Sequence, residues 1–202
     1  IMEGMGGAGA FSDAKYVIST EYGGWLSDFL PGETVLNYIE QADAILVKSG
    51  ATTERFLPSN ELKRLCLQHD LHMSQAQLKH LGTDANFDTM KKLIQSLDGK
   101  VDIAANTEAL DVGRDSHEIR YRHAGREGVL TAETIVFAVG RAGSRFFSKW
   151  CADHQIPLQN NQVDIGVRVE LPSMVWEEFS KKIYEPKIWY RSKQYGDKTR
   201  MF

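Results

Sequence analysis

The sequence has little cysteine and no long apolar run. Its 202 residues include two cysteines, Cys66 and Cys151, which lie far apart and form no C-x-x-C pattern. The chain therefore lacks the C-x-x-x-x-C pair of disulfide reductases, and we expect buried free thiols in a reducing, cytoplasmic setting. No apolar stretch approaches the roughly 18 residues that a membrane-spanning helix needs, so we expect no membrane partner.

Basic residues are not in excess either. The 24 Lys and Arg residues are outnumbered by 27 Asp and Glu residues, which gives a formal net charge of -3. Nucleic-acid binders are usually more basic, so we expect no nucleic-acid partner. The six histidines show no metal-ligand spacing, and we predict no metal site. With 42% apolar residues, the chain can build a folded core.

Apolar residues at helical spacing predict five helices. Gly50 and Ser59 are positioned as the end of the first helix and the N-cap of the second. The expected helices cover residues 33–48, the stretch after Ser59, the stretch from a Thr83 or Asp84 cap to Gly99, about 144–153, and the stretch after Pro172-Ser173.

Alternating or continuous apolar runs predict the strands, which indicates a mixed α/β fold with some antiparallel pairing. Residues 135–139 form a continuous apolar run, typical of a parallel strand buried on both faces. The other candidates are 71–77, 101–104, 108–112, 119–123, a strand from Ala132, 163–170 and 187–193.

A glycine-rich loop lies near the start of the chain. Residues 4–9 (GMGGAG) match the G-x-G-x-x-G dinucleotide fingerprint, but that fingerprint needs a strand before it and a long helix after it. Residues 10–20 lack the apolar stripe of such a helix. Three interpretations stay open: an NAD(P)-binding fingerprint that uses Gly4, Gly6 and Gly9, a structural turn, or a loop that approaches a flat cofactor.

Several blocks resemble a known family, the predicted FAD-dependent dehydrogenases of bacteria, which are flavoproteins of the glutathione-reductase-like superfamily. Two positions depart from the family pattern: Ala10 stands where threonine is usual, and Ala14 where glycine is preferred. The matching blocks are 4–15 (GMGGAGAFSDAK), 79–84 (KHLGTD), 135–143 (IVFAVGRAG), 164–170 (DIGVRVE), 184–187 (YEPK) and 196–202 (GDKTRMF).

This resemblance implies a partial FAD/NAD(P)-binding, Rossmann-like α/β domain with an inserted α+β region. It places the N-terminal dinucleotide-binding unit upstream of Ile1 and a further C-terminal portion after Phe202, so that these missing parts of its own chain would be partners. The implied divisions are a flavin-approaching loop (1–15), a substrate-side insertion (16–99), closing strands of the FAD domain (100–172) and the start of a second domain (173–202).

The implied activity is flavin-mediated hydride or electron transfer on a small-molecule substrate, with FAD as cofactor in the full-length protein and NAD(P)H as a candidate electron donor. The fragment alone is expected to be inactive. A non-enzymatic binding module on a degenerate flavoprotein scaffold is the alternative. The expected cofactor contacts are Gly6, Gly7, Ala8, Gly9, Ser12, Ala109, Gly140 and Arg141.

His80 forms a cluster with Thr83 and Asp84 that suits substrate binding or proton transfer, because histidine titrates near neutral pH. His80 and Asp84 are the catalytic candidates. Each candidate side chain also has a structural interpretation. Thr83 and Asp84 can cap a helix, Asp13 can form a turn, and Arg141 and Arg145 can be solvated surface residues rather than partners of a phosphate or carboxylate.

Overall fold

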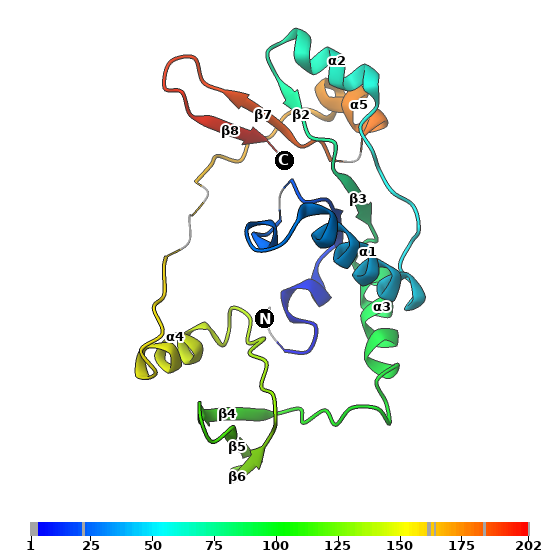
Figure 1. The fold of residues 1–202 in the computed structure, drawn as a ribbon. Helices are drawn as coiled ribbons and strands as arrows, with labels where there is room; N and C mark the ends of the chain where they lie inside the picture. Colours follow the sequence, from blue (N-terminus) through cyan, green and yellow to red (C-terminus); the bar gives the residue numbers. More distant parts are fainter. Residues whose placement is uncertain (1–3, 22, 161–162, 164, 184, 202) are drawn as a thin grey trace. The chain divides into compact units, whose positions relative to one another are not determined.

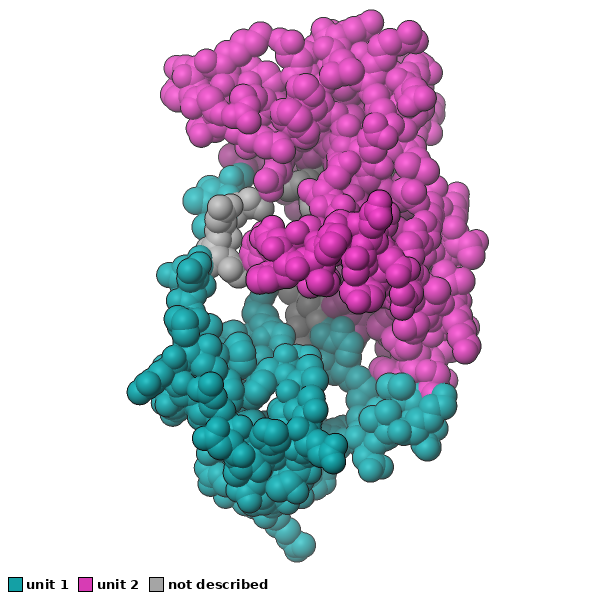
Figure 2. All heavy atoms as spheres, viewed as in Figure 1, with its two compact units in different colours: residues 1–7, 97–166 teal, residues 8–96, 167–202 magenta. Residues whose placement is uncertain are grey.

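The computed structural model describes residues 4–21, 23–160, 163, 165–183 and 185–201. Within these residues the fold is mixed α/β, as predicted, with helices and three small antiparallel sheets (Figure 1). The chain divides into two compact units (Figure 2): Ala8–Ser96 with Val167–Phe202, and Ile1–Gly7 with Leu97–Gly166. The predicted divisions at 15, 99 and 172 stay predictions.

The unit Ala8–Ser96 with Val167–Phe202 contains two of the sheets, β1–β3 and β2–β7–β8. Its elements are a 3-10 helix η1 (Gly7–Phe11, which starts at the edge of the unit), β1 (Lys15–Ile18), η2 (Leu26–Asp28), α1 (Gly32–Lys48), α2 (Asn60–Gln68), β2 (His72–Met73), β3 (Gln77–His80), α3 (Thr83–Gln95), α5 (Ser173–Lys182), β7 (Ile188–Arg191) and β8 (Lys198–Met201).

The unit Ile1–Gly7 with Leu97–Gly166 contains the third sheet and one helix. The sheet is a meander of three strands, each hydrogen-bonded to the next in sequence. Its elements are β4 (Thr107–Val112), β5 (Glu118–His123), β6 (Arg126–Thr131) and α4 (Ser144–Asp153).

The ends of the first two helices confirm their sequence signals. After α1, the Gly50 N–H donates to the Val47 carbonyl and the Ala51 N–H to the Leu46 carbonyl, which is the Schellman pattern. Gly50 has a φ of 108°, a conformation that glycine adopts without steric cost. The Ser59 hydroxyl accepts from the Leu62 N–H at 3.2 Å and caps α2 as predicted.

A buried ionic cluster joins α1 to β3. Lys79 has a side chain that is 1% exposed, and its Nζ lies 2.7 Å from Asp43 Oδ2. Arg55 reaches the same oxygen at 2.9 Å and also binds Glu40, which holds the pKa of that carboxyl below its usual value. Asp43 Oδ1 has no hydrogen-bond partner. Two cations therefore converge on one carboxylate oxygen and fix the strand against the helix.

A second ionic contact joins the residues before β7 to β1. The Glu185 carboxylate contacts Lys187 and lies 3.2 Å from Lys15. Burial raises the pKa of Glu185, but the two lysines lower it by more, so the net pKa lies below the usual value. The Lys187 carbonyl also accepts from the Ser74 N–H at 2.8 Å. The described part of the YEPK block thus links two sheets of the same unit.

The β4–β5–β6 meander has one face of ion pairs. Arg122 contacts Glu108 and Glu127 at 3.3 and 3.0 Å, and Arg120 lies 3.6 Å from Asp111. All five side chains are about half exposed or more, so their contribution to stability is small. These pairs occupy the face that alternates with Ile119 and Tyr121, as the strand period requires.

Aromatic packing organises α4. Trp150 donates its indole N–H to the Val112 carbonyl at 2.6 Å, and Phe147 and Phe137 lie beside its ring. Cys151 is buried in the same helix and has a free thiol. The bounds of α4 match the predicted helix over 144–153.

Two predicted strands are wrong for the described residues. Residues 135–139 form no strand, and Val136 is 82% exposed while Phe137 packs on α4. In the stretch 163–170, apart from Asp164, no strand forms and Arg168 pairs with Glu170 at 3.2 Å in the open. A strand buried on both faces needs paired neighbours, and the described residues provide none for these segments.

Other element predictions were displaced. Residues 101–104 form no strand, and the 71–77 prediction resolves into the separate strands β2 and β3. Helix α3 ends at Gln95 rather than near Gly99, and Gly82 stands at its N-cap without a side-chain bond, in place of Thr83 or Asp84. β6 ends before Ala132, and β8 was not predicted.

The ionic cluster predicts an asymmetry between two substitutions. Asp43→Asn leaves buried Lys79 without an anion and should lower the free energy of unfolding by about 3 kcal/mol or more. Lys79→Met should cost less, because Arg55 still neutralises Asp43. Urea denaturation measures both, with exposed Glu33→Gln on α1 as the control. A smaller loss in Asp43→Asn than in Lys79→Met would contradict the proposed geometry.

The lowered pKa of Glu185 predicts a pH-dependent contribution to stability. A carboxyl whose folded pKa lies below its unfolded value stabilises the fold above the unfolded pKa and loses this effect as the pH falls through the folded pKa. Glu185→Gln should therefore lower the free energy of unfolding by about 1 kcal/mol at neutral pH. The difference from the wild type should close below about pH 4. A gap that stays constant over this range would argue against the ionic bridge.

Candidate functional site

The glycine-rich loop combines left-handed backbone with open space. Gly4, Gly6 and Gly7 have φ values of 98°, 79° and 58°, and the Gly7 N–H donates to the Gly4 carbonyl at 2.8 Å. Gly9 has no left-handed φ, and a Cβ added there would meet no protein atom within 4 Å. Neither backbone conformation nor internal packing requires glycine at position 9. Close approach of another molecule to the backbone is a remaining physical reason for it.

Asn86 of α3 anchors this loop from the protein side. It is fully buried, and its Nδ2 donates to the Gly9 carbonyl at 2.6 Å and to the Ser12 carbonyl at 3.3 Å. Its Oδ1 accepts from the Tyr16 hydroxyl at 2.8 Å, and burial raises the pKa of that tyrosine. Two loop carbonyls are thus engaged inward, on the side of α3.

A serine turn follows the loop and sets the position of Asp13. The Ser12 hydroxyl donates to the Gly9 carbonyl at 3.0 Å and accepts from the Ala14 N–H at 3.1 Å. The side chain that forms the turn is therefore Ser12 rather than Asp13. The Asp13 carboxylate is directed instead to His80, whose Nε2 lies 3.2 Å from Oδ2.

The strand pair β1–β3 holds this carboxylate and imidazole together. Lys15 pairs with His80 in the antiparallel register, and the Gly82 N–H donates to the Asp13 carbonyl at 2.9 Å. The His80 side chain is 19% exposed, so solvent and a ligand can reach it. A histidine oriented by a carboxylate can accept and return a proton at a fixed place.

Asp84, the other catalytic candidate, is not the partner that the structure gives to His80. It lies exposed in the first turn of α3, where a carboxylate favours the helix dipole. The carboxylate at the imidazole comes from Asp13, four residues after Gly9. Sequence reasoning named Asp13 only as a hydrogen-bonding or turn residue.

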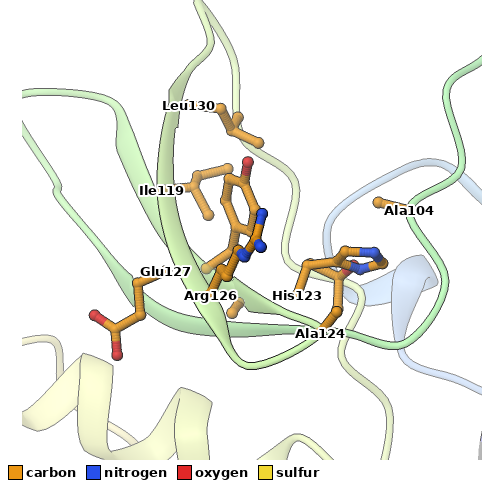
Figure 3. Close-up of a pocket in the computed structure, with 10 residues that line it drawn as sticks. Ala104, Ile119, His123, Ala124, Arg126, Glu127 and Leu130 are labelled. Carbon is orange, nitrogen blue, oxygen red and sulfur yellow. The ribbon is translucent and has the colours of Figure 1, made fainter.

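Ala109 lines a cavity of about 850 Å³ on one face of the β4–β5–β6 meander. Ile119 and Leu130 are among its apolar lining residues, and Thr107, Tyr121, His123 and Arg126 add polar groups. Figure 3 shows Glu127 pointing away from the side on which Ala104 and His123 lie. The volume is within the range of small-molecule sites.

Gly140 and Arg141 lie in the turn before α4. Gly140 has a φ of 58°, and Arg141 is exposed, as is Arg145. Within the described residues neither arginine forms an ion pair with protein. These residues and Ala109 lie in one compact unit, whereas Gly9, Ser12 and His80 lie in the other. Each group is a candidate contact surface by itself.

In the part of the chain that the structure describes, no group of three or more His, Cys, Asp or Glu side chains is arranged to hold a metal ion. No helix there has both the length and the apolar character to cross a bilayer.

Comparisons with known proteins leave the family open. No family model, curated protein or solved structure matches this chain.

The role of Asn86 is testable with a nearly isosteric change. Asn86→Asp removes both donated hydrogen bonds and sets a carboxylate against two carbonyl oxygens, so unfolding free energy should fall by about 3 kcal/mol or more at neutral pH. The pKa of the new carboxyl should be raised, so acidification should restore part of the loss. Urea denaturation at several pH values checks this. Exposed Asn37→Asp on α1 is the control, and an equal, pH-independent effect in both variants would refute the anchor.

Proposed function

We propose that the chain is part of an FAD-dependent oxidoreductase, in which the flavin transfers a hydride or an electron to or from a small-molecule substrate. The protein would supply binding, orientation and proton handling, as is usual for cofactor enzymes. The compartment we propose is the cytoplasm.

The observation that carries this proposal is the meeting of three sequence blocks that resemble one flavoprotein family. Asp13, from the GMGGAGAFSDAK block, contacts His80 of the KHLGTD block at 3.2 Å. Lys15, from the first block, contacts Glu185 of the YEPK block at 3.2 Å. Blocks that are far apart in sequence thus gather around β1, as parts of one site would.

Two backbone positions give independent support. A side chain at position 9 would point into open space, and the backbone there has no left-handed φ, so the fold itself does not require glycine. A glycine at this position would let the loop lie close against a flat cofactor. Ala14 has a φ of 52°, in the left-handed region where glycine is favoured. The resembling family prefers glycine at this position, so the departure at Ala14 changes the residue while the backbone keeps a conformation suited to glycine.

The chemistry that we assign to the chain's own residues is proton transfer. Asp13 orients the His80 ring through Nε2, and Asn86 fixes the adjacent loop through hydrogen bonds to two of its carbonyls. His80 would move a proton to or from substrate while the flavin, when bound, accepts or donates electrons. The proposed cofactor contacts in this unit are Ala8, Gly9 and Ser12, continuous in sequence with Gly6 and Gly7.

An NAD(P) fingerprint at Gly4, Gly6 and Gly9 is less well supported. The motif requires a long helix directly after the glycines. Here the five-residue 3-10 helix η1 already begins at Gly7, within the motif, and the next element is the strand β1. NAD(P)H stays a candidate electron donor rather than the ligand of this loop. The predicted contacts at Ala109, Gly140 and Arg141 stay predictions.

The variant Gly9→Ala tests whether glycine at this position serves FAD binding rather than folding. In the full-length wild-type protein, flavin absorbance should reveal bound FAD. Gly9→Ala should keep the melting temperature, since the added methyl meets no protein atom, but weaken FAD binding by about tenfold or more. Gly24→Ala, which also enters open space without a left-handed φ, is the matched control and should bind FAD normally.

The same measurements discriminate the rivals. Wild-type protein without flavin, or equal FAD affinity in Gly9→Ala and Gly24→Ala, would overturn the proposal. Tight NAD(P)H binding that only Gly9→Ala abolishes would favour the direct fingerprint. Bound flavin with no reduction of any dye acceptor would favour a binding module.

His80→Gln should keep the flavin and lower turnover with a dye acceptor.

A further inference from the structure

The sheet β2–β7–β8 has one strongly cationic face. Cross-strand register places His72 beside Trp189 and Trp189 beside Arg200, and in the next row it places Arg191 beside Lys198. Because alternate residues share a face, these five side chains lie on the same side of the sheet. The other side carries Met73, Tyr190 and the buried Ile188, among others.

Aromatic contacts order this face. The His72 ring stacks on Trp189 with centroids 3.9 Å apart and planes at 11°. Lys198 Nζ lies 4.5 Å from the Trp189 ring centroid, in cation–π range. Arg191 donates from Nη1 to the Gly196 carbonyl at 3.0 Å, within the β7–β8 hairpin loop. The cations are thus held on a common platform.

The arginine and lysine side chains of this face lack a carboxylate partner in the part of the chain that the structure describes. Among the described residues, Arg191, Lys198 and Arg200 form no ion pair, whereas neighbouring Lys193 pairs with Asp70 at 2.7 Å. Like charges placed directly opposite each other destabilise a sheet, and Arg191 and Lys198 are such a pair. In a chain with more acidic than basic residues, this arrangement opposes stability and therefore points to an external anion.

We propose that this face, formed by His72, Trp189, Arg191, Lys198 and Arg200, binds the diphosphate of a nucleotide. Adjacent strands are about 4.8 Å apart and alternate residues about 7 Å apart. The charged ends of Arg191, Lys198 and Arg200 can therefore surround an area about the size of two linked phosphates. Guanidinium groups bind phosphate oxygens in a bidentate manner. The His72–Trp189 pair lies in the same row as Arg200, so a base attached to the phosphates would lie beside this aromatic pair.

The size of the face selects a nucleotide over a nucleic acid. β7 and β8 have four residues each, which corresponds to about 13 Å of strand. Proteins that bind single strands use grooves that track about four or more nucleotides. This surface is too short for such a tract. The inference is independent of the proposed flavin site, because it uses none of that site's residues.

Titration calorimetry on the intact protein tests the proposal with ADP, pyrophosphate and a single-stranded oligonucleotide as probes. ADP should bind with a Kd below about 1 mM and more tightly than pyrophosphate. Arg191→Gln and Arg200→Gln should each weaken ADP binding about tenfold. The control Lys181→Gln, an exposed cation on α5 that pairs with Glu177, should change it by less than about twofold.

A melting experiment excludes a merely structural role for the cations. Arg191→Gln removes the like-charge pair and should melt no earlier than the wild type without ligand. Arg191→Gln and Arg200→Gln should leave FAD binding unchanged, which keeps the result separate from the flavin proposal. Absence of ADP binding, equal losses in the control and the two arginine variants, or tighter binding of the oligonucleotide than of ADP would each overturn the proposal.

Discussion

The buried amide of Asn86 is the interaction on which the candidate site depends. It donates to two loop carbonyls and accepts from the Tyr16 hydroxyl, so one side chain joins α3, β1 and the glycine loop. An amide is the one uncharged side-chain group that both donates twice and accepts. A buried carboxylate would repel the carbonyls, and an apolar side chain would remove all three hydrogen bonds. The loop is therefore held from the side of α3, whereas a Cβ added at Gly9 would meet no protein atom within 4 Å.

Alternation of side chains along β3 connects the Asp13–His80 pair to the ionic cluster of Lys79 and Asp43. In β3, Lys79 points to Asp43 of α1, so the next residue, His80, must point to the other face and reaches Asp13. The salt bridge thus fixes the strand that presents the imidazole, although a buried ion pair is itself weak support for stability. The site owes its position to two polar contacts on opposite faces of one strand.

The sequence was informative where local signals act alone. The helix ends at Gly50 and Ser59 follow from capping chemistry, and the bounds of α4 follow from apolar spacing. Both signals are local and need few distant partners. The run at 135–139 was misjudged, because an apolar run becomes a strand only when neighbours pair with it. Asn86 gave no signal, since an asparagine in a helix is unremarkable until its distant partners are known. For the same reason the sequence groups His80 with Thr83 and Asp84, which are near it in the chain, and gives no sign of its contact with Asp13.

The pairing of β2 with β7 has a consequence for the order of folding. His72 and Trp189 are adjacent in the sheet although more than a hundred residues separate them in the chain, whereas each strand of the β4–β5–β6 meander pairs with its immediate successor. Closing a long loop costs entropy before any contact repays it. On a ribosome, the meander can form as soon as it emerges, but β2 must wait for its partner strand β7, which is synthesised more than a hundred residues later.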